Sequence, residues 1–158
     1  MYSLDYILTI QQNVCINIIL SHMFNKQFFK LYGVALVVFL AIDMVWLLVI
    51  SKDLYARELG YLMAPTVNIL AALIFYLIFI FCLVVFVIQP AISSKSIKDL
   101  VIKAVLFGLV TYATYDLTNL ATIKDWPVLI TVIDLIWGMT VSTLVAVATF
   151  KISEKLKL

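Results

Sequence analysis

Charged residues, glycine and proline are all scarce in this chain. Only 13% of its 158 residues are charged, and it has four Gly and three Pro, whereas 65% of its residues are hydrophobic. An ordinary soluble domain has about a quarter charged residues, which it needs to cover its surface. The deficit excludes a water-soluble globular enzyme, a disordered chain and a nucleic-acid-binding domain, and it predicts a polytopic membrane protein.

Cysteine and histidine are scarcer still, which argues against metal and redox chemistry. The two cysteines, Cys15 and Cys82, do not have the spacing of metal ligands, and Cys82 falls in an apolar run. The single histidine, His22, lies outside the apolar runs, which disfavours a Ser/His triad. A net charge of +2 is too small to indicate a polyanionic partner. We therefore expect no disulfide, no metal site, no cofactor and no nucleic acid, and we assign no catalytic residue.

What the chain does have is long apolar runs. A helix needs about 20 apolar residues to cross a bilayer, and four such runs cover about 31–50, 66–88, 100–120 and 127–150. None alternates with the period of two that barrel strands require, so helices are the structure that satisfies the backbone in lipid. The sequence predicts an all-α bundle of four transmembrane helices.

The ends of the runs are marked by polar residues and proline. Gln89-Pro90 is expected to end the second run, and Ser96 with Asp99 three residues later has the form of a capping box before the third. We expect the transmembrane domain to occupy residues 29–150 and a polar cytoplasmic tail to occupy 151–158.

Residues 1–28 form a separate N-terminal segment. Gln11, Gln12 and Asn13 interrupt the apolar character of residues 1–22, and the positive region of a secretory signal is missing. The segment is either a helix lying on the membrane or a non-native extension, in which case the natural start is Met23. Both alternatives stay open on composition alone.

Lysine and arginine set the expected orientation. With four spans, both termini and the loop 89–99 share one side of the membrane, and that side holds eight of the eleven Lys and Arg residues. The positive-inside rule therefore puts both termini in the cytoplasm. The loops 51–65 and 121–126 face outward, and we expect a short amphipathic segment in the first of them. An aromatic belt at the outer interface would consist of Tyr55, Tyr61 and Trp126.

Three aspartates lie within the apolar runs, where each costs about 2.5–3.5 kcal/mol and normally marks function. Asp43 is seven residues from the outer end of its run and Asp134 seven from Pro127, so both lie roughly 10 Å below the outer surface. Asp116 also lies near the outer end of its run. Asn68 and Asn119 lie close to the same level. The polar residues therefore converge in the outer half of the bundle.

Each aspartate is followed three residues later by an N–H donor. The pairs are Asp43 with Trp46, Asp134 with Trp137, and Asp116 with Asn119, and residues at this spacing share a helix face. The predicted site is an outward-facing polar pocket for a small ligand, and its binding residues are Asp43, Trp46, Asn68, Tyr76, Asp116, Asn119, Asp134 and Trp137. Carboxylates so close in a low dielectric cannot all ionise, which suits a proton carrier, a cation site or a general acid. The alternative is hydrogen bonding that only holds the helices together.

The remaining patterns predict packing. The spacing Ala104-x-x-x-Gly108, and that of Gly138, Ser142 and Ala146, allows helices to approach closely. Tyr112, Tyr115 and the phenylalanines of the second run are expected to face lipid or the core and not to form a ligand cage.

Several segments together resemble a known family. YATYDLTNLAT (112–122), the following Trp126-Pro127, FLAIDMVWL (39–47) and LGYLMAPTVN (59–68) are similar to the bacterial family called domain of unknown function 2177. The resemblance covers about residues 30–150, and residues 1–22 lie outside it, which favours a start at Met23. It implies a small four-helix protein of the bacterial inner membrane and brings no established activity, substrate or catalytic residue.

Three functions fit these observations. The first is binding or carriage of a small solute, cation or proton, as in a transporter. The second is a subunit of a lipid-modifying enzyme, although no nucleophile–base pair supports catalysis. The third is a non-catalytic membrane partner of another protein. Lipids, and a second copy of the chain, are the expected partners.

Overall fold

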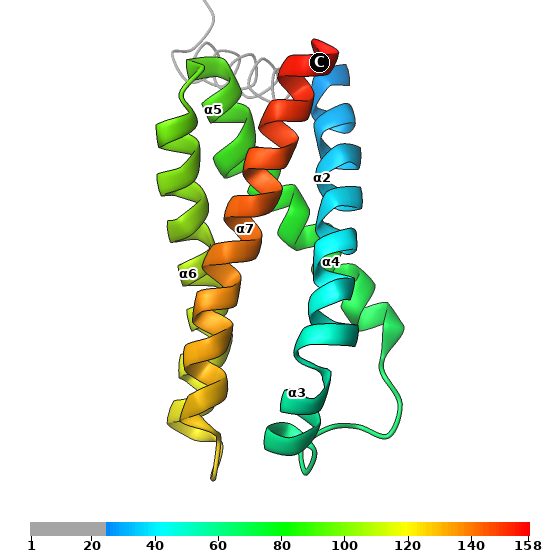
Figure 1. The fold of residues 1–158 in the computed structure, drawn as a ribbon, viewed down its shortest axis with the longest axis vertical. Helices are drawn as coiled ribbons and strands as arrows, with labels where there is room; N and C mark the ends of the chain where they lie inside the picture. The colour runs from blue at the N-terminus through cyan, green and yellow to red at the C-terminus, as the bar shows by residue number, and fades with distance from the viewer. Residues whose placement is uncertain (1–24) are drawn as a thin grey trace, which may run out of the picture.

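A computed structural model describes residues 25–158, and every regular element within that range is helical (Figure 1). The all-α class is therefore confirmed. The predictions for the first 24 residues, including the start at Met23, concern a segment outside the described residues. In chain order the elements are α2 (Lys26–Val45), η1 (Trp46–Ile50), α3 (Lys52–Leu59), α4 (Ile69–Leu83), η2 (Val84–Ile88), α5 (Gln89–Ser94), α6 (Ile97–Thr122) and α7 (Val128–Leu156).

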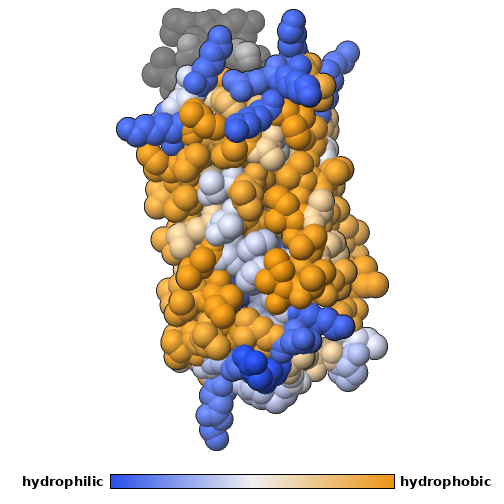
Figure 2. Space-filling view, in the orientation of Figure 1, coloured by the Kyte–Doolittle hydropathy of each residue, from blue (hydrophilic) through white to orange (hydrophobic). Residues whose placement is uncertain are grey.

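Four continuous helical stretches are long and apolar enough to cross a membrane, which confirms the four predicted spans. They are Lys26–Ile50, Ile69–Ser94, Ile97–Thr122 and Val128–Leu156. On the face drawn in Figure 2, a broad apolar belt separates two polar ends, as a bilayer requires. The four spans run up and down, so the starts of α2 and α6 and the end of α7 meet at one end of the bundle (Figure 1). We call this the termini end, and the opposite one, with α3, the loop end.

The second span does not stop at Gln89-Pro90, so this predicted boundary is wrong. The helix passes through Pro90 and ends at Ser94, where Lys95 adopts a left-handed conformation with φ 52°. Proline normally breaks a helix because it lacks an N–H donor and its ring crowds the preceding turn. Here the wider π-helical turn η2 directly precedes it, and π-turns of this kind absorb such irregularities. The last span likewise continues as helix through most of the expected tail.

Side-chain caps define where several helices begin. The Ser96 side chain accepts a hydrogen bond from the Asp99 backbone N–H at 3.2 Å, as the sequence predicts. Asn25 caps α2 in the same way through the Phe28 N–H at 2.9 Å. Each cap satisfies a donor that the first turn of a helix leaves free.

Helices α6 and α7 approach most closely, and small residues make this possible. A Cβ atom added at Gly108 would lie 2.1 Å from the carbonyl oxygen of Gly138, closer than any real contact. Ala104, Ser142 and Ala146, the other small residues of the two patterns, are fully buried. The predicted close packing is confirmed, and it holds these two helices together backbone to backbone.

The apolar core fills the half of the bundle near the termini end. It includes Leu31 and Phe39 of α2, Leu83 of α4, Leu100 of α6 and Val145 of α7, all fully buried. At the loop end the start of α4 is different, because most of its side chains from Ile69 to Ile78 are exposed. Here α4 leans away from the other helices (Figure 1), and the bundle is less tightly closed.

Candidate functional site

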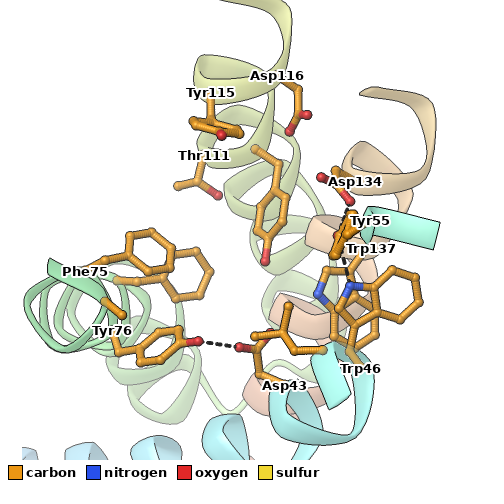
Figure 3. A pocket seen from close by; sticks show the side chains of 14 residues that line it. Asp43, Trp46, Tyr55, Phe75, Tyr76, Thr111, Tyr115, Asp116, Asp134 and Trp137 are labelled. Atoms are coloured by element: carbon orange, nitrogen blue, oxygen red, sulfur yellow. Dashed lines mark hydrogen bonds between the residues drawn. The ribbon is translucent and has the colours of Figure 1, made fainter. Parts of the chain in front are cut away.

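A cavity of about 350 Å³ lies in the loop half of the bundle, between α2, α3, α4, α6 and α7 (Figure 3). Its walls are mostly aromatic, and its charged groups are the three aspartates of the spans. Six of the eight residues predicted for the site line it, namely Asp43, Trp46, Tyr76, Asp116, Asp134 and Trp137. The fold thus brings together side chains from distant parts of the chain.

Asp43 is held between two other helices. It is buried on α2, and the Tyr76 hydroxyl of α4 donates a hydrogen bond to its Oδ2 at 2.9 Å. The indole of Trp137 on α7 also lies near this carboxylate. A buried carboxylate is tolerated when a donor satisfies it. The hydrogen bond from Tyr76 therefore ties α2 to α4.

Asp134 is satisfied by a residue from the short helix α3. The Tyr55 hydroxyl donates to Asp134 Oδ1 at 2.5 Å and accepts a hydrogen bond from Trp46 Nε1 at 3.1 Å. Burial, together with the neighbouring Asp134 carboxylate, raises the pKa of Tyr55 above its ordinary value. Tyr55 is therefore a protonated donor at neutral pH, and it fastens α3 across the loop end of the cavity.

Asp116 differs from the other two aspartates because nothing satisfies it. Its side chain on α6 is 0% exposed, and neither carboxylate oxygen has a hydrogen-bond partner among the described residues. In Figure 3 its carboxyl group points from α6 toward the side where Asp134 lies. Burying an isolated carboxylate is costly, so such a group is either neutralised by a proton or balanced by a cation.

The two Asp-x-x-Trp segments meet in the bundle. The rings of Trp46 and Trp137 stack with centroids 4.2 Å apart and an interplanar angle of 8°. Neither tryptophan pairs with the aspartate three residues before it in the sequence. Trp46 donates to Tyr55, and the indole near Asp43 is that of Trp137 from the other helix. A spacing of three residues places two side chains on one face, but the neighbouring helices decide which groups they meet. The helix also widens into the π-turn η1 at Trp46, which changes the register after Asp43.

Asn68 and Asn119 do not line the cavity. Asn68 is the N-cap of α4, and its side chain accepts a hydrogen bond from the Ala71 backbone N–H at 3.1 Å. Asn119 lies one turn closer to the loop end than Asp116, near Tyr115. The distance of a residue from the end of its helix does not determine which way its side chain points.

Several aromatic residues that the sequence predicts to face lipid, the core or the outer interface line the cavity. They are Tyr55, Phe75, Phe79, Tyr112 and Tyr115. The assignment of Tyr55 to an outer belt is wrong because α3 turns its ring inward. Trp126 is also not part of a belt, since it is only 7% exposed and its Nε1 donates to Thr131 Oγ1 at 3.0 Å.

The position of Tyr112 in the cavity wall could have been predicted from the sequence, whereas that of Tyr55 could not. Tyr112 lies four residues before Asp116, a spacing that puts both side chains on the same face of α6. That relation could have identified Tyr112 from the sequence. Tyr55 could not have been found in this way, because its position depends on how α3 folds back over the bundle.

The chemistry available to the cavity is limited by its residue types. No lysine, arginine, histidine, serine or cysteine is among the residues that line it. Within residues 25–158 no group of three His, Cys, Asp or Glu side chains is close enough to hold a metal ion. Carboxyl groups and the aromatic rings around them are therefore the main chemical groups that the described residues present to the cavity.

Comparison with known proteins identifies a family without an assigned activity. The family described as "Predicted membrane protein (DUF2177)" matches residues 28–151, which is most of the chain. No curated protein and no solved structure matches the chain. With four membrane-spanning helices and a match over nearly its whole helical domain, the chain belongs to the DUF2177 family of membrane proteins.

Proposed function

We propose that the protein binds a cation in the cavity at the loop end of the bundle, as a binding protein or as the first step of carriage across the membrane. The observation that carries the proposal is Asp116, a residue of the cavity wall whose buried carboxyl group has no hydrogen-bond partner within residues 25–158. A carboxyl group needed only to hold helices together would have a donor, as Asp43 and Asp134 have.

The charge balance of the cavity supports a positively charged ligand. Three carboxyl groups line it, and the ion pairs of the described region, Arg57–Glu58 and Lys124–Asp125, lie elsewhere. A cation would offset the charge that burial makes unfavourable, and Tyr112 and Tyr115 would add aromatic faces. Because the three carboxyl groups do not form a cluster that could hold a metal ion, a proton or a monovalent cation suits the site better than a divalent metal.

Orientation and location are part of the proposal. The termini end carries eight of the eleven Lys and Arg residues, which favours the cytoplasmic side of a bacterial inner membrane. The cavity then lies toward the outer face. The other two functions considered from the sequence, a lipid-modifying enzyme subunit and a non-catalytic partner, have no specific contact in the cavity that favours them.

Binding to nanodiscs tests the proposal. The full-length protein in phosphatidylcholine nanodiscs would be titrated with three radiolabelled cations: rubidium, methylammonium and 4-phenylbutylammonium. Empty nanodiscs of the same lipid give the background. We expect saturable binding of at least one cation to the wild type, because the site presents uncompensated carboxyl groups.

Two substitutions and a matched control complete the experiment. Asp116→Asn and Asp134→Asn should weaken binding at least about tenfold, since each removes a charged partner of the ligand. Asp125→Asn makes the same chemical change on an exposed loop side chain and should bind as wild type does. If no cation binds, or if both cavity variants bind like the wild type, the cation site is wrong and the role of a non-catalytic partner gains support.

A further inference from the structure

We propose that the cation is amphipathic, an organic ammonium with an apolar body, and that it enters the cavity sideways from the lipid between α4 and α6. This inference rests on the proposed cation site and adds the class of ligand and its route. It follows from three features: the covered loop end, the opening between two helices, and the aromatic wall that faces the carboxyl groups.

The direct route from the loop end is covered by α3 and the loop after it. Tyr55 of α3 lines the cavity and donates to Asp134. Tyr61, which follows α3, donates from its hydroxyl to the Asp125 backbone carbonyl at 2.7 Å and so joins this loop to the one between α6 and α7. These two tethers hold the segment across the end of the bundle, where a hydrophilic solute would otherwise enter.

The exposed residues of the cavity wall lie on α4 and α6, which indicates that the cavity opens on this side. Phe79 closes it toward the termini end, because its ring packs 5.2 Å from Phe107 and 6.4 Å from Tyr112, centroid to centroid. One turn closer to the loop end the contact is lost. Phe75 on α4 is 49% exposed and Tyr115 on α6 is 61% exposed, yet both line the cavity. Figure 3 shows the two residues on separate helices.

This opening lies at the depth of the hydrocarbon. Phe75 is six residues from the start of α4 at Ile69, and Tyr115 is seven from the end of α6 at Thr122. At 1.5 Å per residue both lie roughly 10 Å inside the ends of their spans. A ligand that passes between them therefore comes from the acyl region, where amphipathic molecules accumulate and small hydrophilic ions do not.

The residues that line the cavity fit both the ammonium group and the apolar body of such a ligand. The unpartnered carboxyl group of Asp116 would take the ammonium, with Asp134 beside it. The rings of Phe75, Phe79 and Tyr112 would take the apolar body. A volume of about 350 Å³ is within the range of small-ligand pockets, which are commonly apolar with a few polar groups that fix orientation.

Three ligands separate the contributions of charge and of the apolar body. 4-Phenylbutylammonium has both, methylammonium has only the charge, and 4-phenyl-1-butanol has only the apolar body. In wild-type nanodiscs, with empty nanodiscs as background, we expect the first to bind at least about tenfold more tightly than either of the others. This comparison needs no variant, so it does not depend on whether a mutant folds.

The aromatic rim of the opening is tested by a matched pair of substitutions. Phe75→Ala should weaken 4-phenylbutylammonium binding several-fold, because Phe75 forms the rim and part of the apolar wall. Phe86→Ala removes a ring of similar exposure on the same span that does not line the cavity, and it should leave binding unchanged.

The outcomes distinguish this inference from the proposed function. If methylammonium binds as tightly as 4-phenylbutylammonium, or if Phe75→Ala binds like the wild type, the amphipathic ligand and its lateral route are wrong while the cation site stands. If the neutral alcohol binds as tightly as the amine, charge plays no part and both proposals are wrong. If neither amine binds, the amphipathic ligand is wrong, and the cation site is overturned as well unless rubidium binds.

Discussion

Replacing Gly108 by alanine tests the contact that sets the distance between α6 and α7. The added Cβ would lie 2.1 Å from the Gly138 carbonyl oxygen, whereas ordinary contact begins at 3.4 Å. The shortfall is about 1.3 Å, and the neighbouring atoms are backbone, which cannot move aside by a rotamer change. The two helices would have to separate. The same separation would disturb Tyr112, whose ring packs against Gly138 on the wall of the cavity.

The expected change in the free energy of unfolding of Gly108→Ala is the sum of two opposing contributions. Overpacking a close interface costs up to about 3 kcal/mol, and alanine favours a helix over glycine by about 1 kcal/mol. We therefore expect Gly108→Ala to lower the free energy of unfolding by about 2 kcal/mol. Gly33 of α2 is the matched control, because a Cβ there would meet no atom within 4 Å. Gly33→Ala should raise the free energy of unfolding by up to about 1 kcal/mol.

Reversible unfolding in mixed micelles of dodecyl maltoside and dodecyl sulfate, followed by circular dichroism, measures both values. The two substitutions add the same methyl group to a helical glycine, so opposite signs can only reflect their surroundings. If Gly108→Ala unfolds at the same dodecyl sulfate fraction as the wild type, the backbone contact between α6 and α7 is not as close as described and the reasoning fails.

Three further predictions concern the hydrogen bonds around the cavity. Tyr55→Phe removes the hydroxyl that donates to Asp134, so amide hydrogen exchange in α3 should accelerate. The control Tyr32→Phe loses a hydrogen bond to a backbone carbonyl of α4 and should leave the exchange in α3 unchanged. The pKa of Tyr55 is higher in the folded protein than in the unfolded chain, so the contribution of Tyr55 to stability is fully present below a pH of about 10 and is lost as the pH rises toward the folded-state pKa. The free energy of unfolding measured against pH should show this alkaline loss in the wild type and a smaller loss in Tyr55→Phe. Asp116→Asn should leave thermal stability unchanged or raise it, because it removes a carboxyl group that has no partner among the described residues. Asp43→Asn should lower stability by about 1 kcal/mol, because it weakens the hydrogen bond from Tyr76. Equal melting temperatures for the two variants would contradict this difference.

Much of the architecture could be read from local patterns. Four apolar runs identify four spans, because the hydrocarbon core selects for length and apolarity alone. The Ser96 cap was predictable because a cap involves residues only three apart. The rule that ended the second span at Pro90 failed because it does not include the π-turn η2 just before the proline.

The candidate site was predictable only in part. The aspartates could be placed at one level because the rise of a helix converts residue counts into depth. Their partners could not, as the pairs Tyr55–Asp134 and Tyr76–Asp43 show, since these join residues 79 and 33 positions apart in the chain. Asn68 does not line the cavity because it is the N-cap of α4, and its side chain accepts a hydrogen bond from the backbone of its own helix.

The amino-acid sequence by itself determined that this chain is a four-helix membrane protein and that three carboxyl groups lie in its apolar spans. Both properties follow from composition and from the order of residues along single helices. Only the tertiary structure decided that α4 leans away at the loop end, that α3 joins the cavity wall through Tyr55, and that Asp116 is the one of the three aspartates without a donor among the described residues. These properties depend on which side chains of different helices come into contact, and packing determines that after the helices have formed.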